Sequence, residues 1–426
     1  MRKQYQYSVR KRVISFALFF LGFISVSGAS GIFQDPENDI IFYRGIVVDQ
    51  DNDPLSSVYL SVRGTNIATV TNDDGEFSLR VPSEFKNTVV NISHLGFQDK
   101  NVPLKFFLRE EPVIALVESV QELSEVNVFD ATDARGLVEK MLEKKGDNYS
   151  DTERRMNAFY RETIKKGNRN VSLSEAVVTI HKEPYSSYAK DNISLVKARK
   201  SADYDRLDTL ALKLQGGPFN NLYMDLMKNT DLMFNQHNLG NYIFSFADPT
   251  RDKGRYLYVV DFYEIVQNEP WFSGRLFIDA QTATLVKATF DLNVEDRRKA
   301  ARMFVQRKPG GTKVYPIDVH YDIEYRERDG KWYYGYGNSE LRFVVNWDRK
   351  LFNSRYTVNS ELAVTDWFVP DSTADTETPD FIEPDIVMAD DISGFADSAF
   401  WGANNIIEPD KSIENAIRKI QQKILD

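Results

Sequence analysis

The sequence of 426 residues contains no cysteine. This absence excludes a disulfide-stabilised fold, a thiol nucleophile and a lipid anchor on a cysteine at a signal-cleavage site. Histidine is scarce as well, because the chain has only His94, His181, His237 and His320, each far from the next in sequence. The motifs His-Glu-x-x-His and Gly-x-Ser-x-Gly are also absent, which excludes two common hydrolase classes.

Long hydrophobic runs are missing too, with one exception near the N-terminus. The exception is the apolar run 13–26, which small residues follow at 27–30 and five cations precede, namely Arg2, Lys3, Arg10, Lys11 and Arg12. This order predicts a secretory signal peptide over residues 1–30, cleaved near Ala29 or Ser30. A membrane anchor is the alternative, although the run is shorter than the ~20 residues that span a bilayer. We therefore expect an exported protein that is not a lipoprotein.

Cations are outnumbered in this chain. It has 53 lysine and arginine residues against 63 acidic ones, a formal net charge of −10. Loss of the five signal-peptide cations leaves 48 against 63, a balance of −15. Such an excess of negative charge disfavours nucleic acid and anionic lipid head groups as general partners. We expect no nucleic-acid binding and, after signal cleavage, at most a peripheral association with membranes.

What the chain does have is a regular strand rhythm over residues 45–97. Residues 45–49 form a short apolar run that is typical of a strand, and the acidic segment 51–54 is typical of a turn. Asn72-Asp73-Asp74-Gly75 predicts a hairpin tip, and the alternating segment 76–81 predicts the strand that follows it. This pattern indicates a small β-sandwich.

The same segments resemble the carboxypeptidase-like regulatory domain. An ordered series of motifs over about a fifth of the chain carries the resemblance: 45–49, Pro54-Leu55, Arg63-Gly64-Thr65, 71–77, 92–97 and Glu125-Val126-Asn127-Val128. It implies a transthyretin-like β-sandwich, closed by residues 126–128, in a periplasmic or outer-membrane-associated protein. Related modules occur in TonB-dependent outer-membrane transporters, so an envelope protein is a candidate partner. The histidine spacing does not supply the zinc ligands of a metallocarboxypeptidase.

The hydrophobic period changes after the sandwich. Apolar residues at i, i+3, i+4 and i+7 predict a helix over 134–142 with Thr132 as its N-cap. Beyond it the strand candidates are 157–164, 173–181, 242–246, 256–265, 274–279, 285–292, 315–325, 332–336, 340–347 and 356–364. Helical interruptions are predicted at 220–228 and 294–304. A long antiparallel sheet with a helical insertion is similar to the half-open barrel of lipoprotein-carrier proteins.

The C-terminal part begins with an acidic stretch. Between residues 371 and 397 there are nine acidic residues and no basic one, which predicts an extended linker. The segment 400–409, Phe-Trp-Gly-Ala-Asn-Asn-Ile-Ile-Glu-Pro, resembles a motif at the C-terminal end of secreted bacterial proteins that begin with the same regulatory domain. Isoleucines at helical spacing then predict a final helix capped by Ser412.

These observations predict a mainly β protein, in which a transthyretin-like β-sandwich precedes a large, curved, half-barrel-like antiparallel sheet with a few helices. The expected organisation is a signal peptide at 1–30, the sandwich at 40–130, a linker helix at 131–150, the sheet domain at 154–368, the acidic linker at 369–398 and a C-terminal motif and helix at 399–426.

Two polar motifs are weak candidates for sites. Asp49, Asp51 and Asp53 alternate as in a calcium loop, but Pro54 occupies the position that needs glycine. Residues 310–313 contain glycines and a lysine without the spacing of a phosphate-binding loop. We interpret both as turns and expect no cofactor.

His320, Asp322 and Glu324 form the most notable polar pattern. Because side chains alternate along a strand, all three lie on one face, and the apolar residues between them lie on the other. The pattern is compatible with a metal site or an acid/base site, and equally with a solvent-facing polar strand.

The second lead is the excess of aromatic residues. Strands 242–246 and 255–262 carry apolar residues at successive positions, so we expect both of their faces to be covered. Trp271, Phe272, Trp332 and Tyr334 lie near predicted turns, where exposed rings would suit contact with a lipid or glycan. Packing at a domain junction would explain them as well.

The sequence therefore favours a non-catalytic binding or scaffolding protein of the cell envelope. Its ligand would be a lipid, a glycan or a hydrophobic segment of a partner, held on the aromatic-rich sheet. The alternative is a hydrolase that acts on an envelope glycan or peptide through two carboxylates ~5 to 9 Å apart in a cleft.

Overall fold

The computed structural model describes residues 39–119, 133–203, 217–235, 238–266, 268–304, 311–348, 352–370, 379–383, 393–397 and 399–425. The predicted signal peptide, the strand at 126–128 and His237 lie outside the described residues. Asp39–Asp426 belong to one compact unit. Among the described helices, none combines the length and the apolar character needed to cross a membrane.

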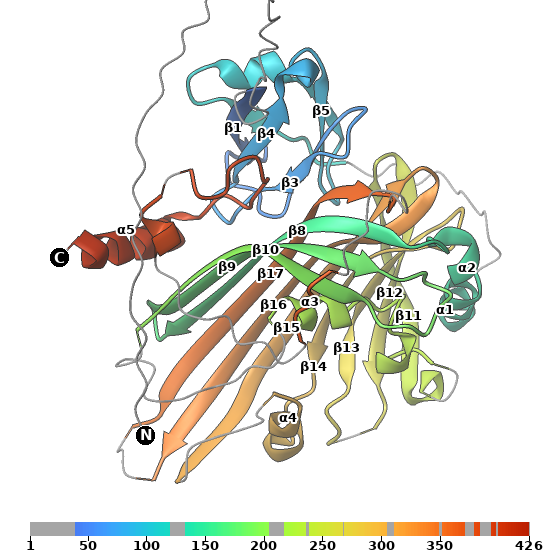
Figure 1. The fold of residues 1–426 in the computed structure, drawn as a ribbon. Helices are drawn as coiled ribbons and strands as arrows, with labels where there is room; N and C mark the ends of the chain where they lie inside the picture. The colour runs from blue at the N-terminus through green and yellow to red at the C-terminus, as the bar shows by residue number, and fades with distance from the viewer. Residues whose placement is uncertain are drawn as a thin grey trace, which may run out of the picture. The chain divides into compact units, whose positions relative to one another are not determined.

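Residues 40–115 form a β-sandwich of two sheets (Figure 1). One sheet has the order β4-β1-β7 and the other the order β3-β2-β5-β6. The strands are β1 (Ile40–Val48), β2 (Tyr59–Val62), β3 (Ala68–Val70), β4 (Glu76–Pro82), β5 (Val89–Ser93), β6 (Lys100–Pro103) and β7 (Val113–Ala115). The 3-10 turns η2 (Ser83–Phe85) and η3 (Leu104–Leu108) complete it. The core contains buried alternating residues of both sheets, including Tyr43, Leu60 and Phe77.

The predicted hairpin tip at 72–75 is present. The Asn72 side-chain oxygen accepts the backbone N–H groups of Asp74, at 3.0 Å, and Glu76, at 2.8 Å. Gly75 has φ +74°, and a Cβ atom there would overlap the carbonyl oxygen of Val47. Glycine is therefore required at this position for both conformation and space.

Two short helices, α1 (Ala134–Glu143) and α2 (Lys145–Asn148), lead to the large sheet. The buried face of α1 carries Ala134, Leu137, Val138 and Met141, as the spacing predicts. The N-cap prediction was wrong: Asp133 caps the helix, because its carboxylate accepts the N–H of Arg135 at 2.9 Å.

The large sheet has ten antiparallel strands in the order β10-β9-β8-β17-β16-β15-β14-β13-β12-β11. They are β8 (Arg154–Lys166), β9 (Arg169–Lys182), β10 (Asn192–Ala202), β11 (Tyr242–Asp252), β12 (Arg255–Glu264), β13 (Phe272–Asp279), β14 (Leu285–Leu292), β15 (Thr312–Arg328), β16 (Lys331–Trp347) and β17 (Ser354–Phe368). The edge strands β10 and β11 do not pair with each other, so the sheet is curved but open (Figure 1).

The strand prediction differs from the structure in two places. The segments predicted at 332–336 and 340–347 are one continuous strand, β16, since the sheet pairs Gly337 and Asn338 on both sides. Strand β10 was missed because Lys197, Arg199 and Lys200 interrupt its apolar alternation.

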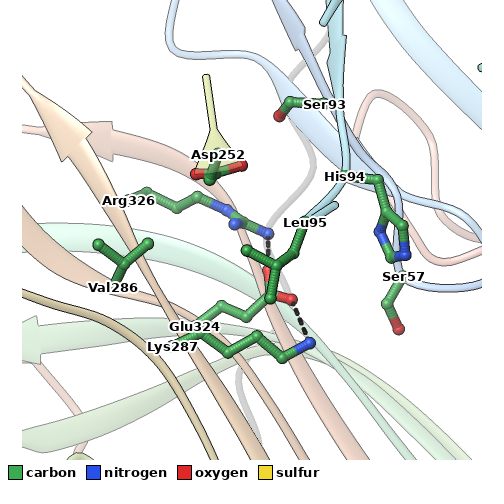
Figure 2. Close-up of a pocket in the computed structure, with 9 residues that line it drawn as sticks. All are labelled: Ser57, Ser93, His94, Leu95, Asp252, Val286, Lys287, Glu324 and Arg326. Atoms are coloured by element: carbon green, nitrogen blue, oxygen red, sulfur yellow. Dashed lines mark hydrogen bonds and ion pairs between the residues drawn. The ribbon is translucent and has the colours of Figure 1, made fainter. Parts of the chain in front are cut away.

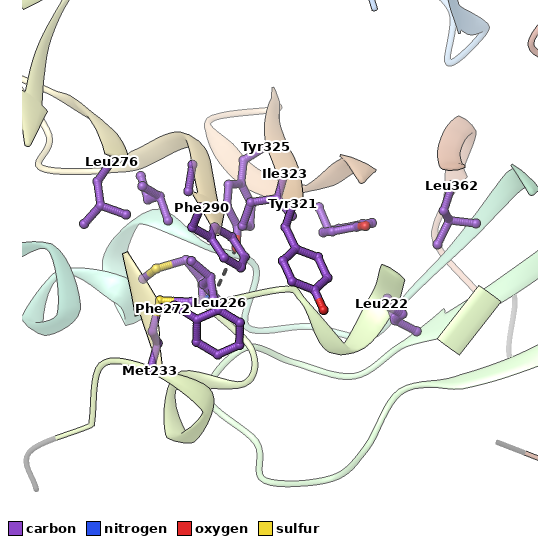
Figure 3. Close-up of a cluster of buried hydrophobic side chains, with 14 of the residues drawn as sticks. Leu222, Leu226, Met233, Phe272, Leu276, Phe290, Tyr321, Ile323, Tyr325 and Leu362 are labelled. Carbon is purple, nitrogen blue, oxygen red and sulfur yellow. Dashed lines mark hydrogen bonds between the residues drawn. The ribbon is translucent and has the colours of Figure 1, made fainter. Parts of the chain in front are cut away.

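Helix α4 (Arg297–Phe304) falls within the interruption predicted at 294–304, whereas α3 (Pro218–Tyr223) overlaps the one predicted at 220–228 and begins two residues before it. Asn221 anchors α3 on the sheet: its side-chain amide donates to the carbonyl of Gly337 on β16, at 2.8 Å, and to that of Ser360 on β17, at 2.9 Å. The 3-10 turns η4 (Thr230–Leu232) and η5 (Leu239–Asn241) follow α3. Leu222 of α3 belongs to an apolar cluster in which the rings of Phe290 and Tyr321 stack at 5.1 Å (Figure 3).

The C-terminal part contains η6 (Ser393–Phe395) and α5 (Lys411–Leu425). Asp410, and not the predicted Ser412, caps α5, because its carboxylate accepts the N–H of Ile413 at 2.8 Å. Of the predicted acidic linker, the described residues 379–383 meet an edge of the sheet, where the N–H of Ile382 donates to the carbonyl of Ile193 on β10.

The expectation that the aromatic strands are covered on both faces was wrong for β11. Within the described part of the chain, Ile243 is 58% exposed and Phe246 is 40% exposed. Strand β11 is an edge strand, so it lacks the second neighbouring strand that a central strand has.

Candidate functional site

Two rows of side chains across the middle of the sheet form the floor of the site. The strand register aligns Glu162 on β8, Ser360 on β17, Ser339 on β16 and Tyr321 on β15. The next row aligns Val358 on β17 with Leu341 on β16. Both rows lie on the same face of the sheet because their positions along each strand differ by two residues.

These rows line a cavity of about 340 Å³ between the sheet and the two helices. Its thirteen lining residues are Glu162, Asn220, Tyr223, Met224, Leu232, Phe272, Met303, Phe304, Tyr321, Ser339, Leu341, Val358 and Ser360. Nine of them are apolar or aromatic. The volume lies within the range of small-molecule sites, roughly 300 to 1,000 Å³.

The polar groups of the cavity are few. Glu162 accepts a hydrogen bond from the Tyr160 hydroxyl at 3.1 Å, and burial raises the pKa of its carboxyl. Burial also raises the pKa of the Tyr321 hydroxyl above its ordinary value. The Ser360 hydroxyl donates to the Asn221 side-chain oxygen at 2.6 Å. No histidine or cation is among the lining residues that the structure describes, so the cavity offers apolar walls and one weak acid.

The structure places the predicted polar pattern on the opposite face of the sheet. His320 contacts two carboxylates: its Nδ1 lies 2.7 Å from an Asp291 oxygen, and its Nε2 lies 3.1 Å from an Asp322 oxygen. The hydrogen bond to Asp322 is the main reason that the pKa of His320 rises to about 9, and Asp291 adds to it.

Glu324 takes part in a different set of contacts. Its carboxylate lies 3.1 Å from the Lys287 ammonium and 2.6 Å from the Arg326 guanidinium (Figure 2). Burial opposes ionisation of this carboxyl, but the two cations lower its pKa to about 2. His320, Asp322 and Glu324 therefore share a face without forming one site. Among the described residues, no group of three acidic or histidine side chains could hold a metal ion.

A polar cavity of about 270 Å³ adjoins Glu324. Sandwich residues Pro54 to Ser57 and His94 line it together with Lys287 and Asp322 of the sheet. Burial lowers the pKa of His94. The carboxylate of Glu324 pairs with the cations of Lys287 and Arg326 beside this cavity. We therefore interpret the cavity as part of a structural contact between the sandwich and the sheet, lined by ion-paired residues.

Two acidic groups with raised pKa values, Glu361 and Asp73, line a smaller cavity. Glu361 is largely buried, accepts a hydrogen bond from the Tyr336 hydroxyl at 3.3 Å, and has a pKa that burial raises to about 6. Burial also raises the pKa of nearby Asp73. The cavity that the two line has only about 30 Å³, far below the roughly 300 Å³ at which small-molecule sites begin.

The predicted ligand-contact aromatics have different positions. Phe272 is buried and lines the 340 Å³ cavity. Trp271 is half-buried and packs on Tyr242, with ring centroids 5.5 Å apart. Of the two alternatives given for Trp332 and Tyr334, exposure or packing, the structure has them packed: both are buried, and the Tyr334 hydroxyl donates to the carbonyl of Asn221 at 3.0 Å.

Several cavity residues were not predicted from the sequence. Leu341 and Val358 belong to predicted strands, but their pattern gives no reason to separate them from ordinary core residues. Met303 and Phe304 end a predicted helix, and their amphipathic spacing was the one available signal. The space itself depends on the separation of α3 and α4, which no local pattern encodes.

Comparison with known families identifies the N-terminal part. Residues 43–128 match the model of the CarboxypepD_reg-like domain, as the motif series predicted. No curated protein matches the chain.

Three solved structures show a distant likeness. A putative outer membrane lipoprotein-sorting protein domain from Vibrio parahaemolyticus has 12% identity and a TM-score of 0.24, over 55% of this chain and 93% of that one. A LolA superfamily protein from Nitrosomonas europaea has 13% sequence identity and a TM-score of 0.21, and the match covers 57% of this chain and 95% of that one. A chain of the Pseudomonas aeruginosa MucA/MucB complex has 13% sequence identity and a TM-score of 0.17, and the match covers 54% of this chain and 93% of that one. At these scores the likeness carries no argument about function.

Proposed function

We propose that this is an exported, non-catalytic binding protein of the cell envelope, periplasmic or associated with the outer membrane. Its ligand is an apolar group, such as an acyl chain or the apolar side of a partner segment. The observation that carries the proposal is the cavity of about 340 Å³ between the sheet, α3 and α4, with its mostly apolar walls. The CarboxypepD_reg-like domain then serves as an interaction module.

The lining of this cavity supports binding rather than catalysis. Nucleophilic catalysis requires a hydroxyl or thiol beside a base, and the Ser360 hydroxyl instead donates to the amide oxygen of Asn221. The cavity has one carboxyl group, Glu162, whereas glycoside hydrolysis requires two.

The alternative hydrolase has one observation in its favour, the raised pKa values of Glu361 and Asp73. A raised pKa suits a general acid. The space beside these two carboxyls, about 30 Å³, has no room for a sugar or peptide, so we favour the binding function.

The apolar row of the floor provides the test. Leu341→Trp fills the cavity from β16, and we expect at least a roughly tenfold loss of affinity for a fluorescent fatty acid, because a filled pocket leaves no buried contact area for the chain. Ile243→Trp adds the same ring on the exposed face of β11 and should leave affinity unchanged.

The measurement is a titration of the probe on the mature protein, with native mass spectrometry and lipid extraction of protein purified from its own envelope. A lipid recovered at near one-to-one ratio supports the proposal. Equal probe affinity in a folded Leu341→Trp variant and the wild type would contradict it.

A further inference from the structure

Helix α4 has a charge opposite to that of the chain around it. Its eight residues, Arg297–Phe304, include four cations and no acidic residue, in a protein with a net charge of −10. Overall charge disfavours anionic partners, but a cationic element of this kind can reverse that preference locally.

The orientation of α4 separates an inner and an outer face. Ala300 is fully buried, and the Phe304 ring meets that of Phe343 on β16 at a centroid distance of 5.9 Å. Arg298 and Arg302 each lie two residues from Ala300, so helical geometry places both on the opposite side, one turn apart. Both are exposed.

The cations of α4 have different surroundings, and the carboxylate of Asp296, at the start of the helix, is the acidic group closest to Arg298 in sequence. Lys299 pairs with Glu269, and the Arg297 guanidinium lies 5.0 Å from the centre of the Tyr315 ring. For the side chains of Arg298 and Arg302, the described part of the chain provides no ion pair. Two positive charges therefore face solvent on one side of the helix.

The same helix forms part of the cavity wall. Met303 and Phe304 line the cavity, and Met303 is also 46% exposed. Helices at a membrane interface combine cations with apolar side chains that enter the lipid, and on α4 Met303 is an exposed apolar side chain near Arg302. Its position at the cavity connects that interface to the apolar interior.

We propose that the outer face of α4 docks on a lipid bilayer with anionic head groups and presents the Met303 side of the cavity to the lipid. The inference rests on the proposed function for its purpose, which is the transfer of an apolar ligand between membrane and cavity. The acidic remainder of the surface is repelled by such a membrane, so the contact is confined to α4. Because two exposed charges carry it, docking is weak and falls with salt.

Flotation with vesicles tests the docking. The mature protein should bind vesicles of phosphatidylcholine with phosphatidylglycerol at low ionic strength, and vesicles of phosphatidylcholine alone far less. Since each cation near an anionic surface contributes roughly fivefold to binding, Arg298→Gln with Arg302→Gln should lower binding about 30-fold. The matched control, Lys86→Gln with Lys105→Gln, removes two exposed sandwich cations and should change binding little.

Two variants separate this inference from the proposed function. The α4 double variant should keep its affinity for the soluble fatty-acid probe, while Leu341→Trp should lose the probe and still float with anionic vesicles. Equal binding to both kinds of vesicle, or an equal loss in the α4 and control variants, would overturn the docking inference. If the folded Leu341→Trp variant binds the probe as tightly as the wild type does, the proposed function fails. That result leaves the vesicle test of α4 unaffected.

Discussion

Single carboxyl groups in this protein differ widely in their ionisation, and the cause in each case is their immediate surroundings. Glu324 and Glu361 both lie on the face of the sheet opposite the cavity. Two cations hold the pKa of Glu324 at about 2, whereas burial raises the pKa of Glu361 to about 6. The two groups therefore affect stability with opposite signs as the pH changes.

We expect Glu361→Gln to stabilise the protein at neutral pH. The folded pKa lies above that of the unfolded chain, so the native state binds more protons between about pH 4.5 and 6, and its stability falls as the pH rises through this window. The ionised form costs about 2 kcal/mol at pH 7, which the amide avoids.

Urea unfolding at pH 5 and pH 7 measures this difference. The wild type should lose stability between the two pH values, and the variant should lose less. Identical pH dependence in both proteins would show that Glu361 does not titrate in this range. Asp261→Asn, whose carboxylate pairs with the exposed Arg275, serves as the control.

On the face of the sheet opposite the cavity, buried ion pairs join three neighbouring strands. Glu175 on β9 is fully buried between Arg161 on β8, with Nη2 2.7 Å from its carboxylate, and Arg199 on β10, with Nε at 2.7 Å. Register places the three residues directly opposite one another. Strand β10, which lacks regular apolar alternation, depends on this contact and on its pairing with β9.

We expect Glu175→Ala to destabilise the protein by about 3 to 5 kcal/mol, because it leaves two buried cations without a counter-charge. Glu340→Gln, which disturbs the exposed pair with Arg342, should cost less than about 1 kcal/mol. Thermal and urea unfolding measure both changes. Similar small losses in the two variants would mean that water reaches the site of Glu175.

At the scale of the whole molecule, the C-terminal segment contacts both β structures. The Asn405 side chain forms two hydrogen bonds with the backbone of Arg80 on β4: it accepts at 2.8 Å and donates at 3.2 Å. Two residues later, the carbonyl of Ile407 accepts from Arg161 on β8 at 2.9 Å. This segment therefore links the sandwich to the large sheet.

We expect Asn405→Ala to destabilise the protein by about 1 to 3 kcal/mol, since the buried N–H and carbonyl of Arg80 lose their partner. Asn415→Ala, on the exposed side of α5, should stay within about 0.5 kcal/mol. Unfolding followed by fluorescence and by limited proteolysis of the C-terminal segment gives the comparison. Wild-type stability with unchanged proteolysis in Asn405→Ala would contradict the role of this contact.

Periodicity and turn chemistry explain how much of the fold could be predicted. The hairpin at 72–75 needs glycine at one position, and period-two alternation along β15 separates its core residues from His320 and Asp322, so both could be inferred locally. The caps were misplaced by one or two residues because Thr132 and Ser412 are as suitable by type as Asp133 and Asp410. Strand β10 was missed because three cations interrupt its apolar alternation, and the partner that accommodates one of them, Arg199, is Glu175 on β9.

The sequence by itself determined the mainly β class, the regulatory domain and the absence of thiol chemistry, because these depend on residue type and local spacing. The tertiary structure alone decided the cavity, since its floor combines β8, β17, β16 and β15 and its walls come from helices far apart in the chain. It also decided that Trp332 and Tyr334 are buried and that Arg298 and Arg302 are exposed beside the cavity. Burial depends on what packs against a side chain, and contacts between distant segments determine that.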